Sequence, residues 1–401
     1  MDRLKVSTAG ESHGRALIGI IEGIPAGLTI EAEAINKQLR RRQQGYGRGG
    51  RMKIEHDQVE ILSGVRWGKT LASPIALKIE NRDWQNWHKG MSTLIQDEAS
   101  IAPVTRARPG HADLAGALKY GFKDIRNVLE RSSARETAMR VALGAVCRAF
   151  LAEFSITIGS FVIRTGGTGK RCYQEAMKAP DGLKDIEDRL VALSSRADES
   201  VVRCPFEEDS QGMIDAIDEA KDKGDTIGGV FEVFAVGLPV GLGSHVQWDK
   251  RLNGQLAQAI MSIQAVKGVE CGLGFDLSQL PGSRLMDEIL YSDDSGFYRL
   301  SNFAGGLEGG MTNGMPLLMR AIMKPIPTQR KPLASIDIVT KETREAAYER
   351  SDVCAVAACS VIAEAMIAFV LTDAMLCKFG GDCVEEAMRN YKNYLNYLKE
   401  F

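Results

Sequence analysis

The sequence has no closely paired cysteines and few histidines. Its eight cysteines are scattered over 401 residues with no Cys-x-x-Cys pair, and no histidine stands at the spacing of a zinc site. We therefore expect free thiols and no metal. Cys354 and Cys359 fall in an alanine-rich segment and are predicted to be small core residues.

The chain also lacks long hydrophobic runs, a signal peptide and a large net charge. We find no stretch of about 18 apolar residues, and the N-terminus lacks the basic, apolar and small-residue order of a signal sequence. The formal net charge of -2 gives no general attraction to nucleic acid. These absences favour a cytoplasmic protein without membrane or nucleic-acid partners. No Pro-rich or Ser-rich linker divides the chain, so we expect a single domain over residues 1–401.

One stretch departs from this neutral balance. No acidic residue lies between Lys37 and Lys53, whereas the same stretch holds Arg40, Arg41, Arg42, Arg48 and Arg51. A local basic patch on a near-neutral protein indicates a local anion, such as a phosphorylated or carboxylated small molecule. An RNA-binding arm over residues 40–53 is the alternative, although the overall charge argues against it.

Strand-like and helix-like patterns alternate along the whole chain, which predicts a mixed α/β or α+β fold. Strands are expected over residues 16–22, 59–62, 75–79, 156–163 and 230–236. Helices are expected over residues 30–41, 134–154, 207–223, 252–263, 353–374 and 385–399.

The clearest helix is residues 134–154, where small apolar residues recur at helical spacing and predict close packing. Ser133 and Glu136 have the spacing of a capping box, so the helix is expected to begin here. Arg131, Arg135 and Arg140 flank this N-terminus, which could hold a phosphate or carboxylate. A plain capped helix with surface arginines is the alternative.

Two of the five histidines lie in glycine turns. His13 stands in Gly10-Glu11-Ser12-His13-Gly14, directly after a strand that ends near Thr8, and His111 stands in Arg108-Pro109-Gly110-His111-Ala112-Asp113. Such histidines suit proton transfer at a ligand site, or they are solvated turn residues. The remaining three are expected to be surface histidines: His56, His88 and His245.

The last third of the chain carries three more candidate segments. Gly305–Gly314 is too glycine-rich for a regular element and is expected to wrap near a ligand or to form a flexible loop. Lys324–Thr328 combines a cation and a hydroxyl with two prolines. Arg350-Ser351-Asp352 precedes an almost uncharged helix, where a ligand contact and a simple cap with a salt bridge are both open.

Together these segments resemble the chorismate synthase family from Arg3 to about Gly381. Five stretches in order carry the resemblance: Gly10–Gly14, Arg108–Asp113, Glu130–Thr137 with Arg140, Val141 and Gly144, Lys324–Thr328, and Arg350–Cys354 with Glu364. The sequence departs from other members at Leu129-Glu130, where they carry glycines, and at Gln43–Gly47, which replaces a proline-containing loop.

The resemblance implies an α+β fold of the chorismate synthase type, a β-α-β sandwich with helices layered between antiparallel sheets, assembled as a homotetramer. It implies a lyase that converts 5-enolpyruvylshikimate 3-phosphate to chorismate and phosphate by anti-1,4-elimination, the last common step towards the aromatic amino acids. It also implies a flavoprotein with reduced FMN as its cofactor. FAD and NADP are further cofactors associated with the family. An external flavin reductase, with NADPH as an indirect reductant, would supply the reduced flavin.

The resemblance also implies roles for individual residues. His111 or His13 would be the acid near the leaving phosphate, with His13 near the flavin, and Asp352 would lie near flavin N5. The implied flavin contacts are Arg131, Ser132, Ser133, Gln264, Ala265, Gly309, Lys324, Pro325, Ile326, Pro327, Thr328 and Arg350. Arg42 and Arg48 match positions ascribed to a nicotinamide cofactor, and the implied substrate contacts are Ser12, Arg48, Arg51 and Arg135.

The chemistry explains why arginines suit this site. Breaking a C–O bond to phosphate leaves negative charge on the leaving group, and the guanidinium groups of Arg42, Arg48 and Arg135 can each pair with two oxygens. How the arginines divide among flavin phosphate, substrate phosphate and carboxylates is open. A flavin oxidoreductase that uses the same pocket is the alternative enzyme.

Overall fold

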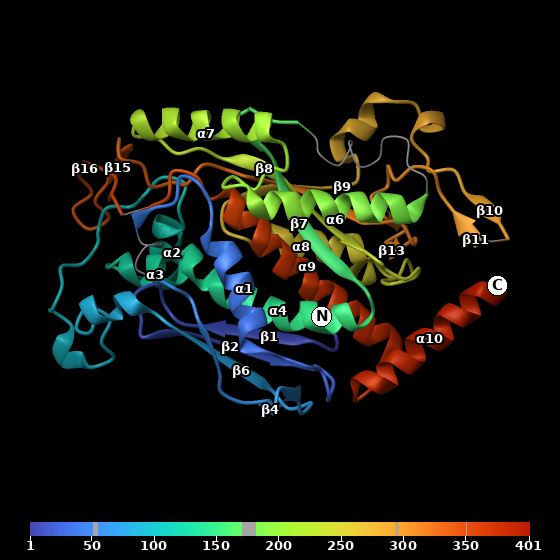
Figure 1. Ribbon diagram of the computed structural model, residues 1–401. Helices are drawn as coiled ribbons and strands as arrows, with labels where there is room; N and C mark the ends of the chain where they lie inside the picture. The colour runs from blue at the N-terminus through green and yellow to red at the C-terminus, as the bar shows by residue number, and fades with distance from the viewer. Residues whose placement is uncertain (51–54, 171–181, 294–295, 350) are drawn as a thin grey trace.

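The computed structural model describes residues 1–50, 55–170, 182–293, 296–349 and 351–401. Two candidate site residues, Arg51 and Arg350, lie outside this part of the chain, as does Cys172. The described residues contain two four-stranded antiparallel sheets with a layer of helices between them (Figure 1).

The first sheet has the order β1-β2-β6-β3 and is antiparallel throughout. Its strands are β1 (Lys5–Ala9), β2 (Ala16–Glu22), β6 (Ile75–Glu80) and β3 (Val59–Ile61). Burial alternates along β6, where Ile75, Leu77 and Ile79 face the core, as expected of a sheet with one solvated face. The β1–β2 connection is the turn that carries His13.

The second sheet has the order β7-β8-β14-β9 and is also antiparallel. Its strands are β7 (Thr157–Thr165), β8 (Gly229–Val236), β14 (Leu317–Met323) and β9 (Val266–Cys271). The central strands β8 and β14 are buried over most of their length, because helices cover both faces of this sheet.

Four helices form the layer between the sheets: α1 (Ala32–Gln43), α4 (Thr137–Glu153), α8 (Leu252–Met261) and α9 (Val356–Phe379). Helix α6 (Leu183–Glu199) packs against the outer side of β7, α7 (Glu207–Asp222) also contacts β7, and α10 (Val384–Glu400) packs against α9 (Figure 1). The predicted α+β sandwich is confirmed, with an additional outer layer of helices.

The remaining elements are short and connect these layers. They are β4 (Val65–Arg66), β5 (Lys69–Thr70), α2 (Asp113–Tyr120), α3 (Arg126–Ser132), β10 (Leu290–Ser292), β11 (Gly296–Tyr298), β12 (Leu307–Glu308), β13 (Met311–Thr312), β15 (Ala334–Ile336) and β16 (Thr343–Glu345). Single turns of 3-10 helix lie at Arg82–Asn86, Ile95–Asp97, Ala134–Glu136, Trp248–Lys250, Gly274–Gln279 and Gly282–Arg284.

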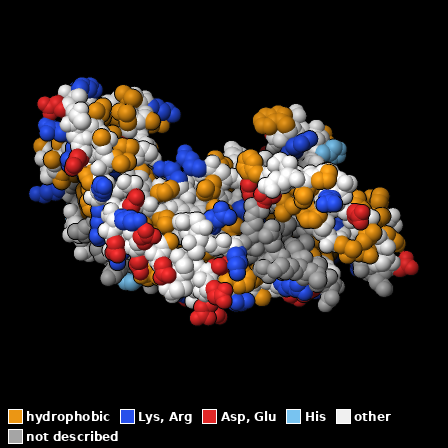
Figure 2. Space-filling model, turned by 90° about the horizontal axis from the view of Figure 1, so that it is seen from above, with side chains coloured by type: hydrophobic (Ala, Val, Ile, Leu, Met, Phe, Trp, Pro, Cys, Tyr) orange, Lys and Arg blue, Asp and Glu red, His pale blue; other side chains and the backbone are white. Residues whose placement is uncertain are grey.

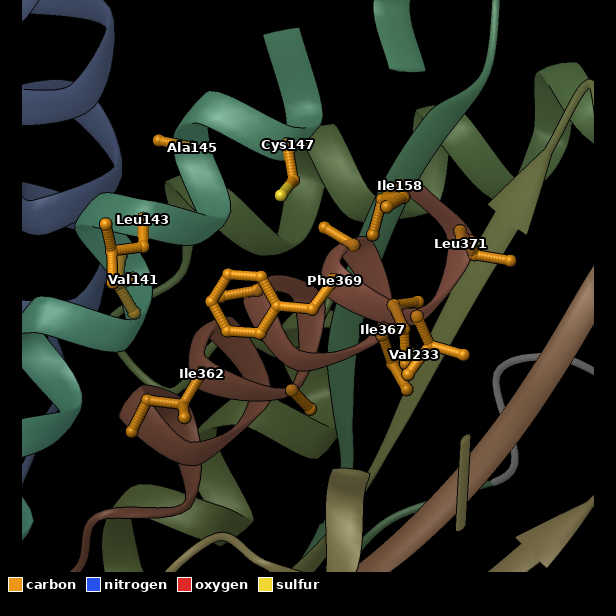
Figure 3. Packing of buried hydrophobic residues seen from close by; sticks show 14 of the residues in the cluster. Val141, Leu143, Ala145, Cys147, Ile158, Val233, Ile362, Ile367, Phe369 and Leu371 are labelled. Atoms are coloured by element: carbon orange, nitrogen blue, oxygen red, sulfur yellow. The ribbon is translucent and has the colours of Figure 1, made fainter. Parts of the chain in front are cut away.

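The crossing of α4 and α9 forms the centre of the core. A Cβ atom at Gly144 would lie 2.4 Å from the Ala365 Cβ, so this glycine permits the close approach of the two helices. Figure 3 shows Leu143 and Cys147 of α4 in the same cluster as Phe369 of α9. The close packing predicted from the small residues of α4 is therefore confirmed.

Helix α9 has the length and composition of a membrane-spanning helix, which the sequence analysis did not anticipate. Its apolar window has a mean hydropathy of 1.8, but 94% of that window is buried inside the protein. The buried carboxylate of Glu364 also lies within it. These properties are those of a core helix enclosed by two sheets.

Two local predictions need correction. Gly305–Gly314 is not irregular, because it contains the hairpin of β12 and β13. Gly309 and Gly310 form its two-residue turn with φ of 60° and 87°, a conformation that suits a tight hairpin and favours glycine. The helix after Ser133 begins as a 3-10 turn, and the Glu136 side chain pairs with Arg140 at 2.6 Å instead of completing a capping box.

The seven cysteines in the described part of the chain are free thiols. Cys354 and Cys359 are buried, as predicted for small core residues, although Cys354 precedes the first residue of α9. Burial raises the pKa of Cys359 to about 12, so this thiol stays protonated at neutral pH.

Candidate active site

The turn between β1 and β2 holds His13 against a buried carboxylate. His13 Nδ1 lies 2.8 Å from Glu130 Oε1, and the His13 backbone N–H donates to Glu130 Oε2 at 2.8 Å. The imidazole stacks on Trp87, with ring centroids 4.4 Å apart. His13 is therefore a fixed side chain and not a freely solvated turn residue.

Glu130 on α3 is ionised in this arrangement. Burial alone would raise its pKa, but hydrogen bonds from His13 and the charges of His13 and Arg126 outweigh burial, so the pKa of Glu130 lies below its usual range. A negative charge therefore faces the ring of His13.

His111 has a similar partner at the start of α2. His111 Nδ1 lies 2.6 Å from Asp113 Oδ1, and Arg108 Nε donates to Asp113 Oδ2 at 2.8 Å. Burial would raise the pKa of Asp113, but hydrogen bonds from His111 and Arg108 hold it well below its usual range. Both glycine-turn histidines are thus paired with ionised carboxylates. The other three histidines are exposed, as predicted: His56, His88 and His245.

The N-terminal end of the α4 segment contacts the His13 turn. Ser133 Oγ accepts a hydrogen bond from the Arg135 backbone N–H and donates to Ser12 Oγ at 3.2 Å. Arg131 donates to the carbonyl oxygens of Thr8 and Gly10. The structure therefore brings together three predicted residues of this region: Ser12, His13 and Ser133.

Three arginines and two carboxylates form what we call the site cluster: Arg42, Arg48, Arg135, Asp57 and Asp352. Arg135 Nη1 donates to Asp57 Oδ1 at 2.5 Å, and Arg42 Nη1 lies 3.5 Å from Asp57 Oδ2. Arg48 Nε lies 2.9 Å from Asp352 Oδ2, and Arg48 Nη1 donates to the Arg42 carbonyl oxygen. Asp352 therefore forms an ion pair with Arg48, one of the predicted anion-binding arginines, and does not cap α9, whose N-cap residue is Ala355.

The site cluster retains buried N–H groups for a ligand. Within the described residues, Arg42 Nη1 and Arg135 Nη2 make no hydrogen bond, and only longer ion-pair contacts reach them, from Asp57 Oδ2 at 3.5 Å and from Glu55 Oε2 at 3.6 Å. Burial, together with the charges of Arg135 and Arg48, lowers the pKa of Arg42 to about 10 against the opposing effect of Asp57 and Asp352. An anion that accepted these N–H groups would satisfy donors that are otherwise expensive to bury.

The segment Lys324–Thr328 joins the site cluster to His111. The Thr328 carbonyl oxygen accepts from Ser351 Oγ at 3.0 Å, beside Asp352. On the other side, Arg108 Nη1 donates to Thr328 Oγ1, and Lys324 Nζ donates to the Gly110 carbonyl oxygen at 3.0 Å. Hydrogen bonds therefore connect segments that are distant in the sequence.

Gln264 and Ala265 are also connected to these segments by hydrogen bonds. Gln264 Nε2 donates to Glu136 Oε1 at 3.0 Å, and the Ala265 carbonyl oxygen accepts from the Lys324 backbone N–H. Gln264 Oε1 is buried and has no hydrogen-bond partner within the described residues.

Within one chain, Gly309 lies away from Gln264 and the other predicted flavin contacts. Its neighbour Gly310 accepts from the backbone of Leu252, the first residue of α8, whereas Gln264 follows the C-terminal end of that helix. A helix of this length spans about 15 Å.

The arginine next to Arg42 belongs to a different group, which we call the core cluster: Arg41, Arg148, Arg203, Asp198 and Glu364. Arg41 donates to both oxygens of Glu364, at 2.6 and 2.9 Å, and Arg148 donates to Glu364 Oε2 at 2.7 Å. The anion for Arg41 is therefore internal, while exposed Arg40 pairs with Glu33. Burial of Arg41 and Arg42 removes them from any RNA-binding surface.

Sequence reasoning missed the carboxylates that hold the histidines. The spacing His111-Ala112-Asp113 is a signal that could have indicated Asp113, because both side chains lie at one helix start. The contacts of Glu130 with His13 and of Asp57 with Arg135 join distant segments, for which the sequence carries no comparable signal.

Two carboxylate-bound histidines in one network with buried arginines form an arrangement that suits proton transfer on an anionic substrate, as in an enzyme active site. The sequence model of the family described as Chorismate synthase matches residues 4–376. The chain therefore belongs to the chorismate synthase family.

Similar proteins agree with this assignment. The chain is 54% identical over 403 residues to the chorismate synthase of Aquifex aeolicus (strain VF5), covering 99% of each chain. It is 55% identical over 401 residues to that of Geotalea daltonii, covering 98% of this chain and 99% of the relative. A solved structure described as "Crystal Structure of Chorismate Synthase" covers 100% of both chains with a TM-score of 0.80 and 46% identity. This chain is of the bacterial type. Members of the family are lyases that catalyse the last step of the shikimate pathway in aromatic amino-acid biosynthesis.

Proposed function

We propose that this chain converts 5-enolpyruvylshikimate 3-phosphate to chorismate and inorganic phosphate by anti-1,4-elimination with reduced FMN. The observation that carries the proposal is the continuous network from the His13 turn through Ser133 and the site cluster to Thr328 and His111. It combines proton carriers with arginine donors, as the loss of a phosphate from an anionic substrate requires.

The residues of this network fit a flavin phosphate and ring. The buried amide oxygen of Gln264 has no hydrogen-bond partner within the described residues, and the helix start at Ser133 favours anions. Bound reduced FMN would supply an electron-rich group that assists C–O cleavage without net oxidation of the substrate. The residues that would hold it are Arg131, Ser132, Ser133, Gln264, Ala265, Lys324, Pro325, Ile326, Pro327 and Thr328, with Arg350 and Gly309 retained from the family resemblance.

The chain's own residues would carry the charge and the protons. Guanidinium groups of the site cluster stabilise the negative charge on the departing phosphate. His111, held at Nδ1 by Asp113, donates a proton towards that phosphate, and His13 holds a proton near the flavin. Asp352 accepts the proton removed from the substrate ring. The substrate is contacted by Ser12, Arg48, Arg51 and Arg135. Arg42 and Arg48 would donate hydrogen bonds to bound NADPH.

The proposal extends to assembly and cellular context. We infer a homotetramer, a single domain over residues 1–401, a cytoplasmic location and an external flavin reductase that uses NADPH. Exposed apolar side chains around the β10–β11 hairpin support assembly, among them Met286, Tyr291, Phe297 and Leu300. Figure 2 shows hydrophobic side chains gathered on the corresponding right-hand part of the molecule. The free thiols are in keeping with a reducing compartment.

Anaerobic turnover tests the proposal. Purified protein, chemically reduced FMN and the phosphorylated substrate should yield chorismate and phosphate in equal amounts, with no NADPH consumed. Formation of neither product would sink the assignment. Net oxidation of the substrate, or one NADPH consumed per turnover, would favour a flavin oxidoreductase instead.

A further inference from the structure

We propose that Glu130 is a positioning residue that fixes the ring of His13 so that Nε2, and not Nδ1, exchanges its proton. The inference deepens the proposed function and rests on it for the kinetic effect. Its basis is geometric: one carboxylate contacts the ring at Nδ1 and the backbone N–H of the same residue, both at 2.8 Å.

These two contacts restrict the ring in different ways. The bond to the backbone N–H fixes the turn, and the bond to Nδ1 fixes rotation of the side chain about that turn. Glu130 is itself restrained, because its side chain is 2% exposed and Arg126 Nη1 donates to Oε1 at 3.2 Å. Stacking on Trp87 at 4.4 Å holds the plane of the imidazole, and the guanidinium of Arg126 lies 4.7 Å from the centre of the same Trp87 ring.

The contact also selects a tautomer. An ionised carboxylate has no hydrogen to donate, so Nδ1 must carry the hydrogen of this bond whether the ring is neutral or charged. Nε2 then becomes the atom that gains and loses a proton. It lies 3.8 Å from Asp83 Oδ2, beyond hydrogen-bonding distance.

Glu130→Gln tests the inference while keeping the side-chain shape. We expect kcat to fall about tenfold or more, with KM for the substrate nearly unchanged, because an acid and not a binding contact is affected. Glu187→Gln is the matched control, since Glu187 also accepts a backbone N–H, that of Gly237, but lies outside the network.

Nitrogen NMR gives a readout that does not depend on turnover. In protein labelled with 15N-histidine, the His13 ring signals, identified by their loss in His13→Ala, should change from a fixed Nδ1–H tautomer to a mixture in Glu130→Gln. If wild-type protein forms no chorismate, the proposed function fails while these spectra still test Glu130. Unchanged spectra and an unchanged kcat in Glu130→Gln would overturn the inference. The inference would also be overturned if kcat, FMN affinity and Tm all fell together in Glu130→Gln, because Glu130 would then serve folding alone.

Discussion

Two groups of arginines lie on either side of one helix turn and differ in whether their hydrogen bonds are complete. Arg41 belongs to the core cluster, where Glu364 accepts from Arg41, Arg148 and Ser160. Its neighbour Arg42 belongs to the site cluster, where Arg42 Nη1 and Arg135 Nη2 have no hydrogen-bond partner among the described residues. The same residue type, buried at both positions of α1, thus has complete hydrogen bonds in one cluster and incomplete ones in the other.

The pKa values of the two neighbours differ in direction for the same reason. Burial lowers the pKa of both guanidinium groups, but the charges of Glu364 and Asp198 reverse the effect for Arg41 and raise its pKa above the usual value. The carboxylates near Arg42 do not compensate, and its pKa falls to about 10. Arg41 has hydrogen-bonded carboxylate partners and supports the fold, whereas Arg42 Nη1 and Arg135 Nη2 make only longer ion-pair contacts and are suited to accept an anion.

The largest expected effect is on the stability of the core cluster. Glu364→Gln removes the fully buried carboxylate that Arg41, Arg148 and Arg203 share and leaves buried positive charge uncompensated. We expect the free energy of unfolding to fall by about 3–5 kcal/mol, as for other broken buried ion pairs. Denaturant titration monitored by circular dichroism measures this change. A loss below about 1 kcal/mol would show that the core cluster is not a structural device.

Acid should weaken the same cluster in the wild-type protein. Burial would raise the pKa of Glu364, but the charges of Arg41 and Arg148 and the hydrogen bond from Arg41 lower it to about 2 from 4.5. A depressed carboxylate pKa contributes stability that is complete above about pH 4.5 and is lost as the pH falls towards 2. Between pH 4.5 and pH 2, the free energy of unfolding should fall more steeply with falling pH for wild-type protein than for Glu364→Gln. Parallel curves would contradict the assignment.

The smallest effect is expected at Arg40, which belongs to neither cluster. Its side chain is 54% exposed, and its partner Glu33 is 71% exposed, so solvent screens the pair. Arg40→Ala should leave both Tm and turnover within experimental error. A marked loss of either would mean that position along α1, and not the completeness of hydrogen bonds, decides the role of each arginine.

The sequence predicted the regular elements well where periodicity was strong. The expected strand over residues 16–22 coincides with β2, and the helix expected over residues 207–223 is α7, Glu207–Asp222. The layered sandwich came from the family resemblance, because alternating elements alone leave α/β and α+β open. The glycine hairpin at Gly309-Gly310 was missed because glycine content indicates a turn without indicating the strands that flank it.

The site was predicted in part. His13, His111, Arg135 and Asp352 were identified as candidates, and the structure joins them in one network. Their carboxylate partners were missed because such pairs are made by tertiary contacts between segments far apart in the chain. The different roles of Arg41 and Arg42 depend on which side of α1 faces Glu364, which a run of three arginines does not specify.

The most direct test of this account compares the same conservative change at the two neighbouring arginines. Lysine keeps the charge but cannot form the paired hydrogen bonds of a guanidinium. With oxidised FMN present, calorimetric titration of the phosphorylated substrate should show Arg42→Lys weakening Kd by about tenfold or more and Arg41→Lys changing it by less than about twofold. Equal effects on both variants, or an unchanged Kd for Arg42→Lys, would contradict the claim that the site cluster binds the substrate anion.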